Sequence, residues 1–532
     1  MYEIWADRMT PAHRPPGRRL GVVLKKEMPL AIGINQSVRI VKPVLFGREV
    51  ELGSVNLGIS GHRSILWSLV PGLDSAALEF HPQRQQASFL GEQTCRPFAR
   101  YLVLHYDRAM MELGVIADDL TGGMMVASLL EREGVHCPLV TSVAGLQGLP
   151  ADTEAVVIGR KIRLIAAADA SADAQASATS LRALGAQRIF YKYCATFDST
   201  EEGNIGPIAQ ALMATLETDR TIFCPAFPEY TVTVFQGRMF LSHIMLGESS
   251  KRFDPVTPMT NSNLVEVLQA QSKSQVGLIS HAVLARGLDE AKAYVDKEVK
   301  DGKNLFLVDA VDDTDVTRIA ELCLHWPLTT GADALPMFLA RAWRDGESAT
   351  PASHLLPPSQ GAEAVIAGSC AQATLDQLDE FSLHHPVFRI DLMASNEAIR
   401  KDLSAWITAN VVNGPVALAT SGDVETVKKA QSKFGVEGAA ERADEILGFA
   451  AQCLRSAGVK KFVVAGGETS GQVMNALGVQ QVQVAPFDNL SGGYCHAPGL
   501  GTSFVLKAGA LGDRRFFFTA LERMREADAQ GA

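Results

Sequence analysis

The chain has 532 residues, of which 47% are hydrophobic and 20% are charged, and it carries a formal net charge of -10. Because this length exceeds what one hydrophobic core usually serves, we expect two or three domains. The composition excludes a disordered or fibrous protein, and the negative charge argues against a general affinity for nucleic acid or anionic membranes.

Cysteine usage and hydropathy indicate the compartment. The eight cysteines are scattered, without the Cys-x-x-Cys pairs of zinc sites or redox couples, so most are expected to be buried hydrophobic residues. No run of eighteen apolar residues could span a bilayer, and the N-terminus lacks the residue order of a signal peptide. We expect a cytoplasmic protein without nucleic-acid or membrane partners; the sequence leaves its oligomeric state open, a homo-oligomer included.

Residues 1–110 differ from the rest of the chain. They hold 14 Lys and Arg against 9 Asp and Glu, whereas the remaining residues hold 35 against 50. The segment lacks a regular alternation of strand and helix patterns, and it ends at Met110 and Met111, just before the first clear strand pattern. It is either a small accessory domain or an extension upstream of a true start codon at one of these methionines; we favour the second interpretation.

From residue 113 onward, short Val- and Ile-rich runs alternate with Ala- and Leu-rich helical patterns, which is typical of parallel α/β sheets. A Ser- and Pro-rich stretch at 346–361 is predicted to be a linker. We therefore predict two doubly wound α/β domains with mostly parallel sheets, at 111–345 and 362–532, and a ligand cleft between them. The predicted strands lie in residues 113–119, 138–143, 155–162, 188–194, 221–227, 275–280, 304–310, 364–369, 388–392, 414–420, 460–469, 481–487 and 504–509.

The first polar cluster lies in "GVIADDLTGG", where Asp118, Asp119 and Thr121 stand between a strand pattern and a helical pattern. In a parallel sheet, the carboxyl end of a strand and the amino end of the next helix meet at the crevice where ligands bind. Asp119 or Thr121 alone would also serve as a helix cap. The complete cluster indicates a ligand site.

A second cluster repeats this pattern in "FYKYCATFDSTEEGNIGP". The strand pattern delivers Lys192, Asp198, Ser199 and Thr200 to its carboxyl end, and Asn204 follows at the start of a helix. Taken singly, these residues also fit turn and capping chemistry, and Lys192 fits a solvated surface charge. Together the two clusters predict a site for a small polyhydroxylated acid, whose hydroxyls donate to carboxylates.

A third stretch, "CPAFPEYTVTVFQGRMF", presents Gln236 and Arg238 after an apolar run. The placement of Arg238 after this run favours a buried contact with an anion over a position on the surface. We expect Lys192 or Arg238 to bind the anionic group of the substrate.

Glycine turns dominate the second domain. The stretches "VIAGSC", "FVVAGGETSG" and "LKAGALGD" combine strand patterns with glycine turns, and the first two enter helices. In that geometry backbone N–H groups can hold phosphate. None matches a Walker loop or a dinucleotide fingerprint, and tight turns need glycine for backbone reasons alone, so these turns favour nucleotide binding only weakly.

Six motifs in a fixed order resemble the four-carbon acid sugar kinase family: "IADDLTGG", "YKYCATFDSTEEGNIGP", "CPAFPEYTVTVFQGRMF", "DPVTPMTNSNLVEVLQAQ", "AGSC" and "VAGGETSG". The stretches "KYCATFDST" and "PVTPMTNSNLV" are most similar to its 3-oxo-tetronate 4-kinase branch. The resemblance covers roughly residues 113–520. It implies an N-terminal sugar-acid domain, a C-terminal nucleotide domain, and transfer of phosphate from ATP to the terminal hydroxyl of a four-carbon sugar acid.

The resemblance also implies a set of ATP contacts, which are Ser369, Gly466, Gly467, Glu468, Thr469 and Gly509. The chain departs from the family pattern at four places. It has Ala367 where serine is usual, "NLSGGYCHAPG" in place of a Gly-Val-Pro-Trp turn, Arg238 where histidine is common, and "TTGADALP" where a glycine-serine pair is usual. These changes bear on nucleotide affinity and substrate choice more than on the fold.

Phosphoryl transfer requires an aligned hydroxyl, neutralised phosphate charge and a base for the hydroxyl proton. We expect Asp119 or Asp198 to be that base and the other to orient the substrate. Spare carboxylates or Glu468 would help to position the Mg²⁺ that accompanies ATP. Two alternatives stay open: a kinase for threonate or erythronate, and a catalytically silent sugar-acid or nucleotide-binding protein.

Overall fold

The computed structural model describes residues 111–254, 257–344, 356–488, 490 and 493–530, and, before residue 111, the backbones of short strands alone. The chain forms two compact units, Met1–Ala109 and Met110–Ala532. Within the described residues, no helix combines the length and the apolar character that crossing a membrane requires.

The first unit contains strands that pair in antiparallel fashion. The rest of this unit lies outside the described residues, as do residue 345 and residues 346–355 of the predicted linker. The start-codon interpretation therefore stays a prediction. The strands are β1 (Glu3–Ala6), β2 (Gly21–Lys25), β3 (Gln36–Ile40), β4 (Val44–Leu45), β5 (Arg48–Glu49), β6 (Val55–Leu57), β7 (Ser64–Ser68), β8 (Ala77–His81), β9 (Gln86–Leu90) and β10 (Leu104–His105).

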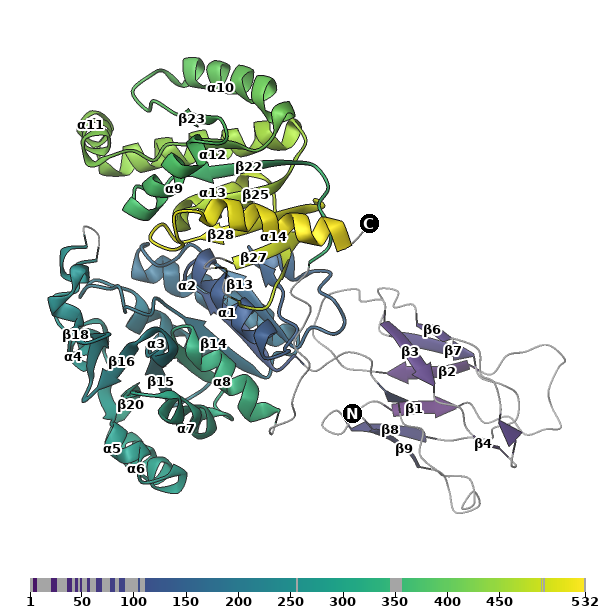
Figure 1. Ribbon diagram of the computed structural model, residues 1–532. Coiled ribbons are helices and arrows are strands. Elements are labelled where there is room, and N and C mark those ends of the chain that lie inside the picture. Colours follow the sequence, from purple (N-terminus) through teal and green to yellow (C-terminus); the bar gives the residue numbers. More distant parts are fainter. Residues whose placement is uncertain are drawn as a thin grey trace. The chain divides into compact units, whose positions relative to one another are not determined.

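The second unit is built on one 15-stranded sheet (Figure 1). Its first eight strands are all parallel and form the first α/β domain. In spatial order they are β19 (Gln275–Ile279), β20 (Lys303–Val308), β15 (Thr221–Cys224), β21 (Leu328–Gly331), β14 (Arg188–Lys192), β11 (Leu113–Ala117), β13 (Ala155–Gly159) and β12 (Leu139–Val140).

Helices cover this half of the sheet. α1 packs against α8, whereas α2 packs against α3, as expected for right-handed crossovers that place helices on opposite faces. A separate antiparallel sheet contains β16 (Val232–Phe235), β17 (Arg238–Leu241) and β18 (Ile244–Met245). The helices are α1 (Leu120–Arg132), α2 (Ala167–Ala183), α3 (Ile205–Thr215), α4 (Leu264–Gln271), α5 (His281–Leu284), α6 (Leu288–Lys300), α7 (Asp313–Cys323) and α8 (Ala334–Trp343).

The second α/β domain continues the same sheet. β12 pairs antiparallel with β26, and this pairing joins the two halves. In spatial order its strands are β26 (Gln481–Val484), β27 (Gly493–Ala497), β28 (Thr502–Lys507), β25 (Val459–Ala465), β22 (Ala362–Ala367), β24 (Val416–Ala419) and β23 (Val387–Arg389). Its helices are α9 (Gln372–Ser382), α10 (Asn396–Asn410), α11 (Val424–Phe434), α12 (Val436–Ser456), α13 (Gly467–Ala476) and α14 (Phe516–Gln530).

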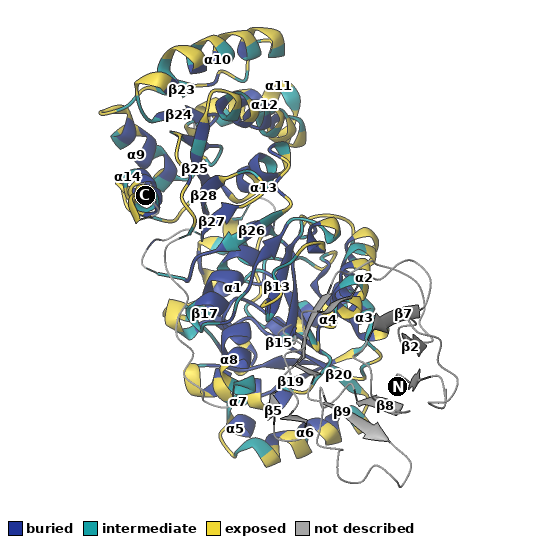
Figure 2. Ribbon diagram, turned by 90° about the vertical axis from the view of Figure 1, so that its right-hand side faces the viewer, coloured by how far each residue is buried: buried dark blue, intermediate teal, exposed yellow. Residues whose placement is uncertain are grey.

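Burial explains why the sequence forms this sheet. β11, β13 and β28 are buried along their whole length, since helices cover both faces of a parallel sheet (Figure 2). The exposed residues lie mainly on the outer sides of the helices (Figure 2). The predicted α/β fold class is confirmed, and four of the seven described cysteines are buried as expected.

Strand order also locates the ligand crevice. The chain runs from β11 to β12 and β13 on one side, and then crosses over to β14 on the other side. The carboxyl ends of β11 and β14 therefore flank a topological switch point, which is where open α/β sheets bind ligands.

Candidate active site

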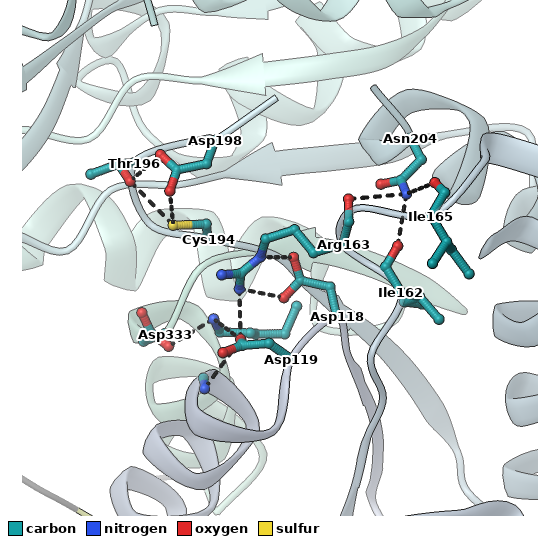
Figure 3. A network of polar contacts seen from close by, with 12 residues as sticks. Asp118, Asp119, Ile162, Arg163, Ile165, Cys194, Thr196, Asp198, Asn204 and Asp333 are labelled. Carbon is teal, nitrogen blue, oxygen red and sulfur yellow. Dashed lines mark hydrogen bonds and ion pairs between the residues drawn. The ribbon is translucent and has the colours of Figure 1, made fainter. Parts of the chain in front are cut away.

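Charged side chains from three neighbouring strands meet at this switch point (Figure 3). Asp118 and Asp119 directly follow β11, Lys192 is the last residue of β14, and Asp333 follows β21. The structure thus brings Lys192 of the second predicted cluster to the aspartates of the first, and it adds a carboxylate that the sequence had not assigned to a site.

Asp118 is paired with Arg163. Two hydrogen bonds of 2.7 and 2.8 Å join the guanidinium to both carboxylate oxygens of Asp118, whose side chain is only 3% exposed. Such a bidentate pair fixes the plane of the guanidinium. Nη1 of Arg163 takes part in neither of these bonds, and 25% of this side chain is exposed.

Asp119 both caps helix α1 and joins the charged cluster. Its Oδ1 accepts a hydrogen bond of 3.2 Å from the Gly122 N–H and one of 2.6 Å from Arg163, and it lies 3.7 Å from Nζ of Lys192. Burial alone would raise the pKa of Asp119, but the nearby charges of Arg163 and Lys192 lower it below its ordinary value. The capping interpretation is therefore correct, but it covers only one of three contacts made by this oxygen.

Lys192 is not a solvated surface charge, because its side chain is only 3% exposed. Burial alone would lower the pKa of Lys192, but the carboxylates of Asp333, Asp119 and Asp118 raise it above its ordinary value. Asp333 lies 3.4 Å away and occupies the N-cap position of α8 without capping the helix. Burial raises the pKa of Asp333, and the charge of Asp119 adds to this effect, whereas Lys192 opposes it.

Asp198 belongs to an adjoining network. Its carboxylate accepts hydrogen bonds from Thr196 at 2.6 Å, from the Cys194 thiol at 3.2 Å and from Lys251 at 2.7 Å. Burial raises the pKa of the Cys194 thiol, whereas the charges of Arg163 and Lys192 oppose this effect. The buried residue before Asp198, Phe197, has φ +52°, a conformation that costs energy and tends to persist at functional sites.

Three other predicted residues have structural contacts. Ser199 is buried and accepts a hydrogen bond from Gln271, and the Thr200 hydroxyl donates to Glu202. The buried Asn204 amide donates to three backbone carbonyls in the segment around Arg163. Asn204 thereby holds the loop that carries Arg163.

The expectation of a buried anion contact at Arg238 is wrong. Gln236 and Arg238 are exposed at the β16–β17 turn, and the Arg238 guanidinium donates to the Gln236 carbonyl at 3.3 Å. The physical reason is that this apolar run forms a hairpin rather than a strand of the large sheet. The buried Asp309 holds the turn by accepting from the N–H groups of Gln236 and Gly237.

The predicted ATP residues of the second domain lie on three adjoining turns, which follow β22, β25 and β28. Ser369 follows β22, Gly466 follows β25, and the Ser369 N–H donates to the carbonyl of Ala465. Gly509 packs so closely on Ser369 that a Cβ atom there would lie 1.9 Å from the serine hydroxyl. Close approach therefore requires glycine at position 509. Thr469 is buried in the first turn of α13.

The two domains meet where these turns approach the carboxylate cluster. A Cβ atom at Gly467 would lie 3.7 Å from the Thr121 hydroxyl, which is buried without a hydrogen-bond partner. Across the same boundary, Lys161 forms an ion pair of 2.6 Å with Glu468. A small pocket also lies between the domains, lined by Thr121, Met125, Ser128, Phe487, Gly493, Leu506, Ala508 and Leu511.

Three charged residues of the site were missed in the sequence: Arg163, Lys251 and Asp333. The basic run "GRKIR" after β13 is a signal for Arg163, because β13 ends at the same sheet edge as β11. "TTGADALP" contains Asp333 but lacks the apolar run that identifies a strand. Nothing in the sequence singles out Lys251, which enters the site from a distant 3-10 helix.

Comparison with known proteins gives an independent result. Residues 113–339 match the family model described as "Sugar-binding N-terminal domain", and residues 364–517 match the "Nucleotide-binding C-terminal domain". A 3-oxo-tetronate kinase from Burkholderia multivorans is 37% identical over 419 residues, covering 77% of this chain and 97% of the relative. A 3-oxo-tetronate kinase from Pseudomonas fluorescens is also 37% identical, covering 78% of this chain and 98% of the relative.

The fold has solved counterparts as well. A Salmonella typhimurium LT2 structure, described as that of a candidate tRNA synthase, superposes with a TM-score of 0.68 at 32% identity, covering 77% of this chain and 99% of that one.

Proposed function

Because this chain belongs to the four-carbon acid sugar kinase family, we propose that it transfers the γ-phosphoryl group of ATP to the C4 hydroxyl of a four-carbon sugar acid, with 3-oxo-tetronate as its substrate. The observation that carries this proposal is the approach of Thr121 to Gly467. It brings the carboxylate cluster of the sugar-binding domain next to a glycine turn of the nucleotide-binding domain. Donor and acceptor can therefore be bound side by side, which is the main requirement of phosphoryl transfer.

The cluster suits a sugar acid chemically. Three carboxylates, those of Asp118, Asp119 and Asp333, surround the two cations Arg163 and Lys192. The excess of acceptors suits the hydroxyl donors of a sugar. For the substrate carboxylate, Arg163 is better placed than the exposed Arg238, since its Nη1 donors are not used by Asp118 or Asp119.

The proton of the C4 hydroxyl requires an acceptor. In our proposal it passes to Asp119 or Asp198, and the other carboxylate orients the hydroxyl. Lys192 and Arg163 hold Asp119 in its ionised form, and Lys251 holds Asp198 by an ion pair. An ionised, fixed carboxylate can accept a proton as the bond to phosphorus forms.

The nucleotide would be bound by the turns that contain Ser369, Gly466, Gly467 and Gly509. Mg²⁺ bound to the phosphates would neutralise charge during transfer. In the part of the chain that the structure describes, no group of three or more His, Cys, Asp and Glu residues could hold a metal by itself. One or two carboxylates beside the ATP phosphates, such as Glu468, would fit the usual mode of Mg²⁺ binding. We also propose that the enzyme works in the cytoplasm, where ATP is available.

A coupled assay of ADP release tests this function with 3-oxo-tetronate, threonate and erythronate. We expect the highest kcat/KM with 3-oxo-tetronate. Faster turnover of threonate or erythronate would show that the chain is a kinase of the same family with that acid as its substrate. If ATP and a sugar acid bind but no ADP is released with any of these acids, the chain is a silent binding protein and the proposal fails.

A further inference from the structure

Lys507, the last residue of β28, is buried inside the nucleotide-binding domain with 0% of its surface exposed. Its Nζ donates a hydrogen bond of 3.1 Å to the Thr374 hydroxyl and one of 2.9 Å to the Gly509 carbonyl. The Thr374 hydroxyl donates to the same carbonyl at 2.8 Å. The ammonium group thus lies directly behind the Gly509 turn.

No carboxylate pairs with Lys507 among the described residues. Charged groups on the surrounding elements have other partners. Glu468 of α13 pairs with Lys161, and Lys461 of β25 pairs with Asp528. On α9, Asp379 and Glu380 pair with Arg389 and Arg514, and Asp376 accepts a hydrogen bond from Gln372. Asp513, before α14, accepts a hydrogen bond from the Arg515 N–H. On β27, burial raises the pKa values of Tyr494 and Cys495, which keeps both groups neutral near pH 7.

An unpaired buried ammonium is costly, and burial lowers the pKa of Lys507 to about 8. The N-terminus of α9 carries the partial positive charge of the helix dipole, and no acidic residue in the first turn offsets that charge. The folded domain therefore maintains positive charge behind the adjoining turns that contain Ser369 and Gly509, without an acid to balance it. An anion bound at these turns would provide the missing charge.

We propose that Lys507 is a positioning residue of the nucleotide site, which holds the Gly509 turn and supplies the positive charge that attracts a phosphate group of ATP. The inference rests on the proposed function, since it requires ATP phosphates at this turn. Lys507 acts through Gly509 and Thr374 rather than by contacting the phosphate. Its protonation should therefore be coupled to ATP binding.

Three variants separate charge from structure. Lys507→Met removes the ammonium, Lys507→Arg keeps a charge at all accessible pH values, and Lys461→Met removes a buried lysine of the same domain that is paired with Asp528. Lys507→Met should weaken ATP binding roughly 10- to 100-fold, the range for losing a hydrogen bond to a charged group. Adenosine and sugar-acid binding should change less than about 3-fold, because neither ligand carries a phosphate. Lys507→Arg and Lys461→Met should bind ATP nearly as the parent does.

Proton linkage gives a readout that a purely structural role would not change. Calorimetry at pH 8 in two buffers of different ionisation enthalpy should show proton uptake on ATP binding by the parent and none by Lys507→Arg. The affinity of the parent for ATP should fall as the pH rises from 7.5 to 9.5, because Lys507 loses its proton. This loss should be absent in Lys507→Arg.

The outcomes are distinct. If the parent binds no ATP at all, the proposed function fails together with this inference. If the parent binds ATP and Lys507→Met binds it equally well, only the inference fails. Equal losses of ATP and adenosine binding would also overturn it, as would proton uptake that persists in Lys507→Arg. Should Lys507→Met fail to fold, the parent and Lys507→Arg still decide the question through proton uptake.

Discussion

Replacement of Asp119 by asparagine separates catalysis from helix capping. Asparagine caps a helix about as well as aspartate, so the hydrogen bond from Gly122 should be kept. In this variant Arg163 keeps its bidentate hydrogen bonds with Asp118, and Lys192 keeps its ion pair with Asp333. Only the charge interaction at Oδ1 is lost. We therefore expect a loss of about 1.5–3 kcal/mol in the free energy of unfolding, the range for one hydrogen bond to a charged group.

Turnover should change far more. If Asp119 accepts or orients the proton of the C4 hydroxyl, kcat for 3-oxo-tetronate should fall by roughly 10²–10⁴. Steady-state ADP release and thermal unfolding, measured on the same preparation, give both quantities. Asp198→Asn is the parallel variant for the second network. If both variants turn over 3-oxo-tetronate at the parent rate, neither carboxylate has the proposed role, and both are structural.

Three further predictions address other parts of the molecule. Gly467→Val should weaken ATP binding, because its side chain blocks close approach of phosphate to the backbone N–H groups, but it should spare sugar-acid binding. The variant should fold, because a Cβ at this position meets only the Thr121 hydroxyl, at 3.7 Å. Equal loss of both ligands in a folded variant would refute the assignment of the ligands to separate domains. A chain starting at Met111 should match the full chain in stability and ADP release, and unfolding of this truncation would show that residues 1–110 are a required domain. The contacts of Asp119 lower its pKa in the folded protein, so its charged form stabilises the fold at pH values above the unfolded pKa of about 4. This stabilisation is lost as the pH falls through the folded pKa of Asp119. Acid unfolding of Asp119→Asn at the same pH as the parent would contradict this expectation.

Hydrophobic pattern was sufficient to predict most of the large sheet. Each predicted run overlaps a strand, because strands buried on both faces need continuous apolar residues. β21 was missed because its sequence, Leu-Thr-Thr-Gly, is half polar although all four residues are buried. The Thr330 hydroxyl is satisfied by donating to a carbonyl of the neighbouring β15, whereas the buried Thr329 hydroxyl has no hydrogen-bond partner. The partner on β15 lies far away in the sequence, so no local pattern reveals it.

The position of the site in the fold could be predicted from the sequence, but the pairing of its charged groups could not. Lys192 and Lys507 are each the last residue of a buried strand, and in the sequence they are equivalent. In the fold, Asp119 and Asp333 approach Lys192, and their charges raise its pKa. Lys507 has a hydroxyl, a carbonyl and the ring of Phe516 beside it but no carboxylate among the described residues, and burial lowers its pKa. The first lysine is therefore already balanced by the protein, whereas the charge of the second is left for a bound anion to balance.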